Sequence, residues 1–261
     1  MLDLIHSLPL ALLGAVIVAP FITIAVGGAV LVRRWRLENL EEYRETAGLI
    51  YTTAGVLYAV VLGFVVVTVW EDYSRAEMTV RDEANALADL YRISDTLDPA
   101  FRGQIRSRLE AYVSAAIQQE WPALARGQHS ADTAAQALSL LHALTRYTPP
   151  AARESALYAE MLKHATRFID SRRERHEAAQ LGVQPALWWV LLLGSVLIIG
   201  FSCLFVVRSV LMHIAVVTIP AALIGMMFFL IVAMDSPFRG GMAIEPAPLQ
   251  QLLDDWRGRA A

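Results

Sequence analysis

Four long apolar runs divide the chain into two pairs, and a polar stretch separates the pairs. The runs are Ser7–Val32, Thr46–Trp70, Ala178–Val207 and Ser209–Met234, and none contains an Asp, Glu, Lys or Arg. Each is longer than the roughly 20 residues that an α-helix needs to cross the hydrocarbon core of a bilayer. The pattern therefore predicts a polytopic membrane protein with four transmembrane helices and a polar insert between the second and third.

The insert shows helical periodicity throughout. Apolar residues continue at helical spacing beyond the second run, and no Pro or Gly interrupts the chain between Phe64 and Pro99, so helix 2 should run on into the insert. Asp98 and Pro99 are typical of a helix start. Further helices are expected over about 99–121, 132–147 and 151–180. No segment alternates with period two, so we predict an all-α fold with an extramembrane helical bundle continuous with helix 2.

These elements imply a division into four segments. Residues 1–70 hold transmembrane helices 1 and 2, 71–185 the extramembrane bundle, 186–235 transmembrane helices 3 and 4, and 236–261 a short C-terminal tail. Four spans place both termini and the insert on one side of the membrane. The arginines near the spans are divided between the two sides, so the orientation stays open.

Composition agrees with a membrane location. Apolar residues make up 56% of the chain and the mean hydropathy is +0.45. The net charge of −3 gives no reason to expect nucleic acid as a partner. Lys163 is the only lysine among many arginines, a usage typical of a GC-rich bacterial genome. We expect a multi-pass protein of the bacterial inner membrane.

Small residues recur on one face of helix 2. Steps of three and four residues separate Gly48, Thr52, Gly55, Ala59 and Gly63. In lipid, a face of small residues lets helix backbones approach closely. This face either packs against a neighbouring helix, within the chain or across an oligomer, or lines a pore or cavity.

The motifs of common catalytic sites are absent from the sequence. No nucleophile elbow, phosphate-binding loop or dinucleotide-binding glycine pattern occurs, and we expect no enzyme and no cofactor. The six histidines form no pair with the spacing of a zinc motif, so no metal site is predicted. Glu160 and His164 are four residues apart on one helix, but a single pair is not a metal site.

Two short polar groups are candidates for binding. Arg172, Arg173 and Arg175 form a basic cluster before helix 3, which is either a solvated face or a group that attracts anions or lipid headgroups. Helix 4 ends at a second group, which either only terminates the helix or also binds headgroups. Its members are Asp235, Pro237, Arg239 and Gly240.

Several segments resemble the bestrophin-like domain family of bacterial membrane proteins. They are Tyr58–Phe64, Val69–Glu71, Glu83–Arg92, Glu120–Pro122, Trp188 with Leu191–Gly194, and Asp235–Gly240. Bestrophins themselves are pentameric anion channels with four spans and a large helical insert between spans two and three. The resemblance therefore implies an ion channel of the anion type.

Two functions follow from these expectations. The first is a homo-oligomeric ion channel in which helix 2 lines the pore with its small residues, and in which rings of Val65, Val66 and Val69 gate by dewetting. Its partners would be membrane lipid and small inorganic ions. The alternative is a non-catalytic membrane scaffold or sensor whose insert binds a partner.

Overall fold

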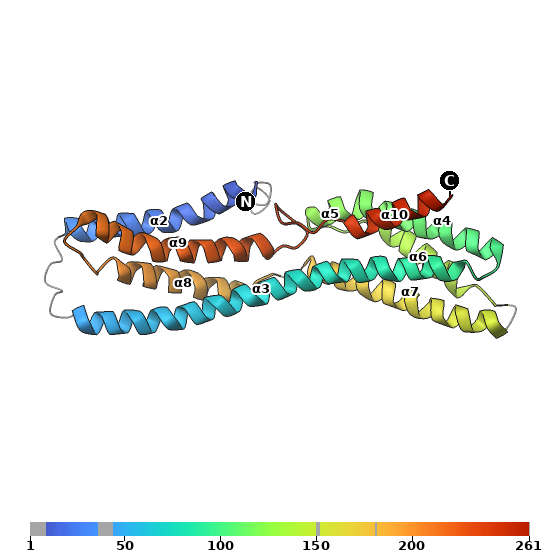
Figure 1. Ribbon diagram of the computed structural model, residues 1–261, viewed down its shortest axis with the longest axis horizontal. Helices are drawn as coiled ribbons and strands as arrows, with labels where there is room; N and C mark the ends of the chain where they lie inside the picture. The colour runs from blue at the N-terminus through green and yellow to red at the C-terminus, as the bar shows by residue number, and fades with distance from the viewer. Residues whose placement is uncertain (1–8, 36–43, 150–151, 181, 261) are drawn as a thin grey trace. The chain divides into compact units, whose positions relative to one another are not determined.

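The computed structural model describes residues 9–35, 44–149, 152–180 and 182–260. Most of these residues are helical, and no strand occurs among them. The elements are α2 (Leu10–Arg34), α3 (Arg44–Ser94), α4 (Pro99–Ala115), the π-helical turn η2 (Ala116–Glu120), α5 (Trp121–Ala125), α6 (Ala131–Thr145), α7 (Ala152–Ala178), α8 (Pro185–Ser202), α9 (Val210–Met234) and α10 (Ala247–Ala260) (Figure 1). The predicted all-α fold is confirmed.

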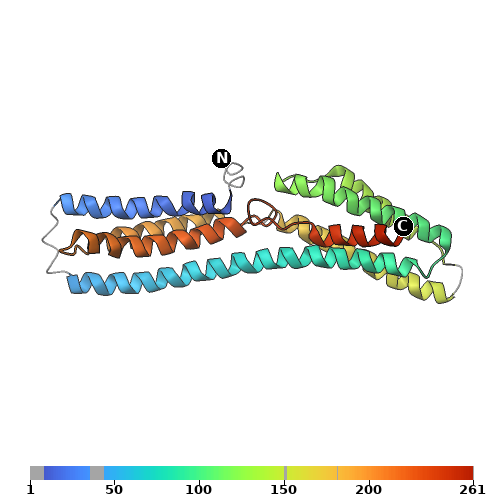
Figure 2. The ribbon, with the colours of Figure 1, turned by 45° about the horizontal axis from the view of Figure 1, so that its top comes forward.

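The chain forms two compact units. Unit 1 consists of Met1–Glu71 and Gly182–Asp235, and unit 2 of Asp72–Leu181 and Ser236–Ala261. Helix α3 is 51 residues long and contributes to both units, as the unbroken ribbon in Figure 2 shows. The helix runs from Arg44 to Ser94 without a break, because no helix breaker interrupts its sequence.

Unit 1 holds the membrane-spanning parts. Four helices are long and apolar enough to cross a membrane: Leu10–Arg34, Thr46–Ser94, Pro185–Ser202 and Val210–Met234. Helices α2 and α9 lie side by side in both views (Figures 1 and 2). A Cβ added at Gly225 of α9 would lie 3.1 Å from the Cα of Val18 in α2, so the absence of a side chain allows this close approach.

Helices α3 and α8 of unit 1 are joined by a tyrosine. The Tyr58 hydroxyl donates a hydrogen bond of 2.9 Å to the carbonyl oxygen of Leu191. The Tyr58 ring occupies the position that a Cβ on Gly194 would take. Gly194 therefore makes room for the contact that holds the membrane part of α3 against α8.

Unit 2 is a helical bundle around one apolar core. Asp98 caps α4 by accepting hydrogen bonds from the backbone N–H groups of Ala100 and Phe101 at 3.0 and 3.1 Å, as the sequence predicts. The helix predicted to end near Trp121 and Pro122 instead continues. It passes through the π-helical turn η2 into α5, where Pro122 occupies the first turn and needs no N–H partner.

The expected C-terminal tail includes a helix of unit 2. Leu249, Leu253 and Trp256 of α10 are buried in the core of the bundle, where the Trp256 ring stacks on Tyr91 of α3 with 4.5 Å between ring centroids. The Trp121 indole N–H donates to the carbonyl oxygen of Ile244, just before α10. The tail thus completes the core of this unit.

Candidate functional site

The small residues of α3 form a face that the rest of the described chain leaves uncovered. A Cβ added at Gly48, Gly55 or Gly63 would meet no atom within 4 Å, other than those of its own helix turn. Thr52 and Ala59 between them are exposed, and the Thr52 hydroxyl donates to the Gly48 carbonyl oxygen. These five residues are called the open face below. Unlike Gly194, the glycines of the open face make no close packing contact within the described chain that would account for their small size.

Bulky apolar side chains of α3 are exposed as well. Val56, Val60 and Phe64 follow one another at steps of four residues and are 59%, 51% and 70% exposed. By contrast, Val65 and Val69 are buried in the core of unit 1, and Val66 packs against that core. In this conformation, the valines expected to form gates contact helices of their own chain.

Unit 2 contains a buried network of charges. Arg175 of α7 and Glu83 of α3 are both fully buried. The guanidinium Nε donates to Glu83 Oε2 at 2.6 Å and Nη2 donates to Oε1 at 3.2 Å, a bidentate pair. The Tyr112 hydroxyl of α4 donates to the same carboxylate at 2.5 Å. The guanidinium also lies over the Trp121 ring, 4.7 Å from its centroid.

Glu120 is the second buried carboxylate of this network. Arg172 Nη2 lies 3.3 Å from both of its oxygens, and Arg175 Nη2 lies 3.9 Å from Oε2. Burial alone would raise the pKa of Glu120, but the contact with His176 and the charges of Arg175 and Arg172 together lower it below its ordinary value. Two arginines thus face two carboxylates inside the bundle.

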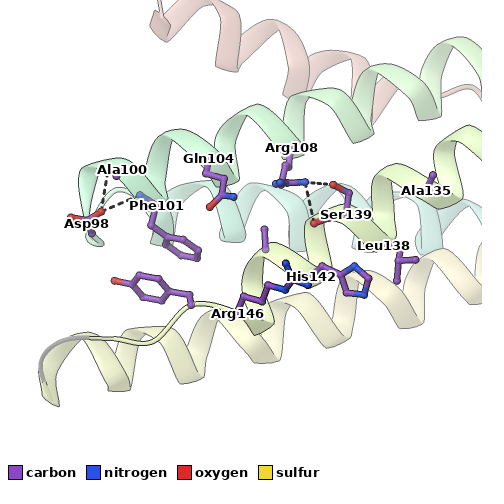
Figure 3. Close-up of a pocket in the computed structure, with 12 residues that line it drawn as sticks. Asp98, Ala100, Phe101, Gln104, Arg108, Ala135, Leu138, Ser139, His142 and Arg146 are labelled. Carbon is purple, nitrogen blue, oxygen red and sulfur yellow. Dashed lines mark hydrogen bonds between the residues drawn. The ribbon is translucent and has the colours of Figure 1, made fainter.

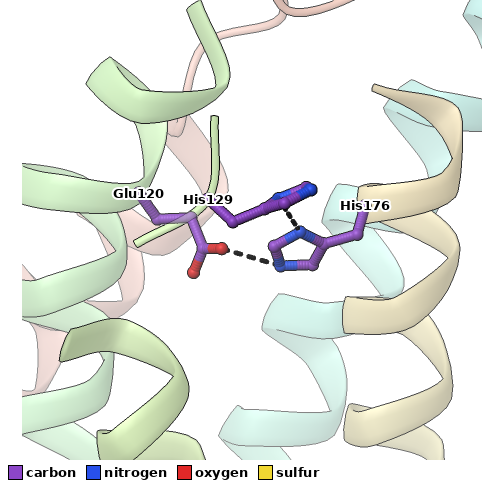
Figure 4. A group of neighbouring side chains, drawn as sticks. All are labelled: Glu120, His129 and His176. Atoms are coloured by element: carbon purple, nitrogen blue, oxygen red, sulfur yellow. Dashed lines mark hydrogen bonds and ion pairs between the residues drawn. The ribbon is translucent and has the colours of Figure 1, made fainter. Parts of the chain in front are cut away.

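A pair of histidines extends the network toward the surface, as Figure 4 shows. His176 Nε2 of α7 lies 2.7 Å from Glu120 Oε1, and His176 Nδ1 lies 2.6 Å from Nδ1 of His129. His129 is exposed and comes from the connection between α5 and α6. Glu120, His129 and His176 each offer a ligand atom, and these atoms lie within 4.8 Å of one another.

The basic cluster predicted from the sequence is therefore divided by the fold. Arg175 is fully buried and Arg172 is 17% exposed, and both contact carboxylates of the network. Only Arg173 is on the surface, where it pairs with Glu177 of the same helix at 2.9 Å. The three arginines therefore do not form one common face, because successive residues of a helix point in different directions.

The group at the end of α9 contributes to a turn between two helices. Asp235 follows α9, and its Oδ1 accepts a 2.6 Å hydrogen bond from the backbone N–H of Val183. The N–H of Ile244 donates to the Pro237 carbonyl oxygen, while Gly240 has φ of 81°, a left-handed conformation that favours glycine. The N–H of Arg239 donates to the Ser236 carbonyl oxygen. Helix α9 ends at Met234, directly before this group.

A cleft of about 750 Å³ opens between α4 and α6 of unit 2, as Figure 3 shows. Phe101, Arg108, His142 and Arg146 are among its lining residues. The Arg108 guanidinium donates to the Ser139 hydroxyl, which fixes the cationic group at the wall. The cleft has mixed apolar and basic walls.

Comparison with known families follows from this fold of four candidate spans and an intervening bundle. The profile of the Bestrophin-like domain matches residues 19–249. The chain belongs to the bestrophin-like domain family.

Solved structures of a bacterial bestrophin homologue from Klebsiella pneumoniae share the fold of this family member. One point mutant has a TM-score of 0.71 at 14% identity, over 94% of this chain and 99% of that chain. Another has a TM-score of 0.69 at 15% identity, over 92% and 99% of the two chains. At these identities, the likeness shows the fold alone. No curated protein matches the chain.

Proposed function

We propose that this bestrophin-like protein is a homo-oligomeric channel for small inorganic anions in a bacterial inner membrane, with α3 lining the pore. The observation that carries the proposal is the open face of α3. An apolar membrane helix normally buries its small residues against a neighbour. Within the described chain, no residue covers Gly48, Gly55 or Gly63, so that face is available to a pore or to another subunit.

The side chains around the open face suit ion passage. No Asp, Glu, Lys or Arg lies between Thr46 and Trp70, so the wall has no fixed negative charge that would favour cations. Exposed Val56, Val60 and Phe64 are placed to form apolar constrictions that gate by dewetting, in an assembly whose symmetry repeats each residue around the axis. In this proposal the core of unit 1 holds α3 in position through its contacts with Val65, Val66 and Val69.

The test is ion flux in proteoliposomes, measured separately with chloride and potassium gradients and a counter-ion ionophore. Gly55→Leu and Gly63→Leu should abolish chloride flux, because the added side chains enter open space and not the core of the chain. The matched control is Gly27→Leu in α2, where an added Cβ also meets nothing within 4 Å. Chloride flux that survives both α3 changes would exclude the open face as the pore wall. Potassium flux would overturn the proposed selectivity.

A second candidate function is supported by the cleft between α4 and α6. Its basic and apolar lining fits a sensor or scaffold in which unit 2 binds a partner. This function predicts no ion flux by correctly assembled protein. It also predicts that Arg146→Glu, which reverses a charge at the cleft wall, abolishes partner crosslinking.

A further inference from the structure

Three side chains with metal-ligand chemistry meet in unit 2, and they come from three different segments of the chain. Glu120 is the last residue of η2, His129 lies on the connection between α5 and α6, and His176 is near the end of α7. Their rings and carboxylate point toward one another in Figure 4. A π-helical turn is rare and is often found at functional sites.

We propose that Glu120, His129 and His176 bind one divalent transition-metal ion of the zinc type. Two imidazoles and one carboxylate are ligands that suit zinc and its neighbours in the first row, whereas magnesium and calcium prefer sites made of oxygen atoms. Three protein ligands leave one position of a tetrahedral ion for water. The inference concerns unit 2 and does not depend on the proposed channel.

The three ligand atoms lie within 4.8 Å of one another and would have to rearrange around a single ion, since His176 faces Glu120 with Nε2 and His129 with Nδ1. Ligand atoms around a tetrahedral zinc ion are about 3.3 Å apart, given metal–ligand bonds of about 2.0–2.2 Å. The Nδ1 atoms of His129 and His176 are 2.6 Å apart in the metal-free chain. Binding would separate them by about 0.7 Å more. His129 can move this far, because it is exposed and lies between helices.

Neighbouring groups hold the three ligands in place. Gln180, one turn after His176, contacts Nε2 of His129 at 2.8 Å. With its amide oxygen toward the ring, it would accept the Nε2 proton and leave Nδ1 of His129 as the free donor atom. Arg172 contacts both oxygens of Glu120. Carboxylates that bind a metal usually accept such hydrogen bonds from neighbouring groups, which fix their orientation.

The positive charges of the arginines next to the site are offset within the buried network. The two buried arginines face Glu83 and Glu120, so their charges are already balanced within the network.

The proposal is tested by calorimetric titration of zinc chloride into the full-length protein, purified in detergent without a histidine tag and stripped with a chelator. The expected result is one zinc ion per chain, not displaced by excess magnesium. His129→Ala should weaken zinc binding by about 100-fold or more, since even residues behind the ligands contribute about 10–100-fold. The exposed position of His129 makes this variant the one least able to disturb folding.

The matched control is His142→Ala, which removes an exposed histidine of the same unit outside the cluster and should leave zinc affinity unchanged. Cobalt in place of zinc gives a second readout, because its visible absorption reports the ligand set and should be lost in His129→Ala. The proposal is overturned if the unaltered protein binds no zinc. It is also overturned if His129→Ala binds zinc as tightly as the unaltered protein. Either result would leave the two histidines as a hydrogen-bonded pair.

Discussion

Replacing Arg175 by methionine tests the buried network most directly. The side chain is fully buried, and its removal deletes two hydrogen bonds to Glu83 and the contact with the Trp121 ring. Glu83 would then remain a buried carboxylate that keeps only the hydrogen bond from the Tyr112 hydroxyl among the described residues. Removing one partner of a buried ion pair lowers stability by about 3–5 kcal/mol. The measurement is thermal or denaturant unfolding in detergent, monitored by tryptophan fluorescence. Unit 2 contributes to this signal through the buried Trp121 and Trp256.

Two companion variants separate this effect from a general loss of arginine. Arg173→Ala removes the neighbouring arginine, whose pair with Glu177 is exposed on both sides, and should change stability by about 0–1 kcal/mol. The double variant Glu83→Leu with Arg175→Met removes both buried charges. It should be more stable than Arg175→Met alone, because an unpaired buried charge is worse than none. If the double variant is no more stable than the single one, the unpaired carboxylate is not the source of the destabilisation, and the reasoning fails.

Three further predictions concern packing, capping and pH. Gly194→Val should displace the Tyr58 ring and destabilise unit 1 by about 1–3 kcal/mol, which lowers the midpoint of thermal unfolding. Gly200→Val on the same helix is the control and should change this midpoint little, because a Cβ added there meets nothing within 4 Å. Asp98→Ala should lower the unfolding free energy by about 1 kcal/mol through loss of the α4 cap, while Asp98→Asn should retain most of it. The pKa of Glu120 is lower in the folded than in the unfolded chain, so the stability that its charge contributes is complete above the unfolded pKa and is lost as pH falls toward the folded pKa. Glu120→Gln should therefore reduce the loss of unfolding free energy on acidification. An unchanged loss would contradict the lowered pKa of Glu120.

The membrane helices could be predicted from the sequence because bilayer insertion is a property of single segments. Each apolar run is long enough to span by itself, and the helices of unit 1 correspond to the four predicted runs. The length of α3 could be predicted for the same reason, since it depends only on unbroken helical spacing along one segment of the chain. The π-helical turn was not predictable in this way, because Trp121 and Pro122 are typical of a helix end and the turn depends on how the bundle packs.

The buried network and the histidine cluster could not be predicted, because their members come together only through tertiary contacts. Glu83 and Arg175 are 92 positions apart, and His129 and His176 are 47 apart. Spacing rules for metal ligands consider residues on one helix or one loop. The nearest sequence signal was the helical pair of Glu160 and His164. In the structure, His164 contacts Asp89 of α3 as well as Glu160.

The sequence by itself determined the four spans, the long α3 helix and the all-α class, since apolar length and helical periodicity act along the chain. Tertiary structure decided which faces those helices present. It left the small residues of α3 uncovered, buried Val65 and Val69, and turned Arg175 inward while Arg173 stayed exposed. Helical side chains point in all directions around the axis. Only the packing of neighbouring elements determines which of them meet water, lipid, or a partner charge.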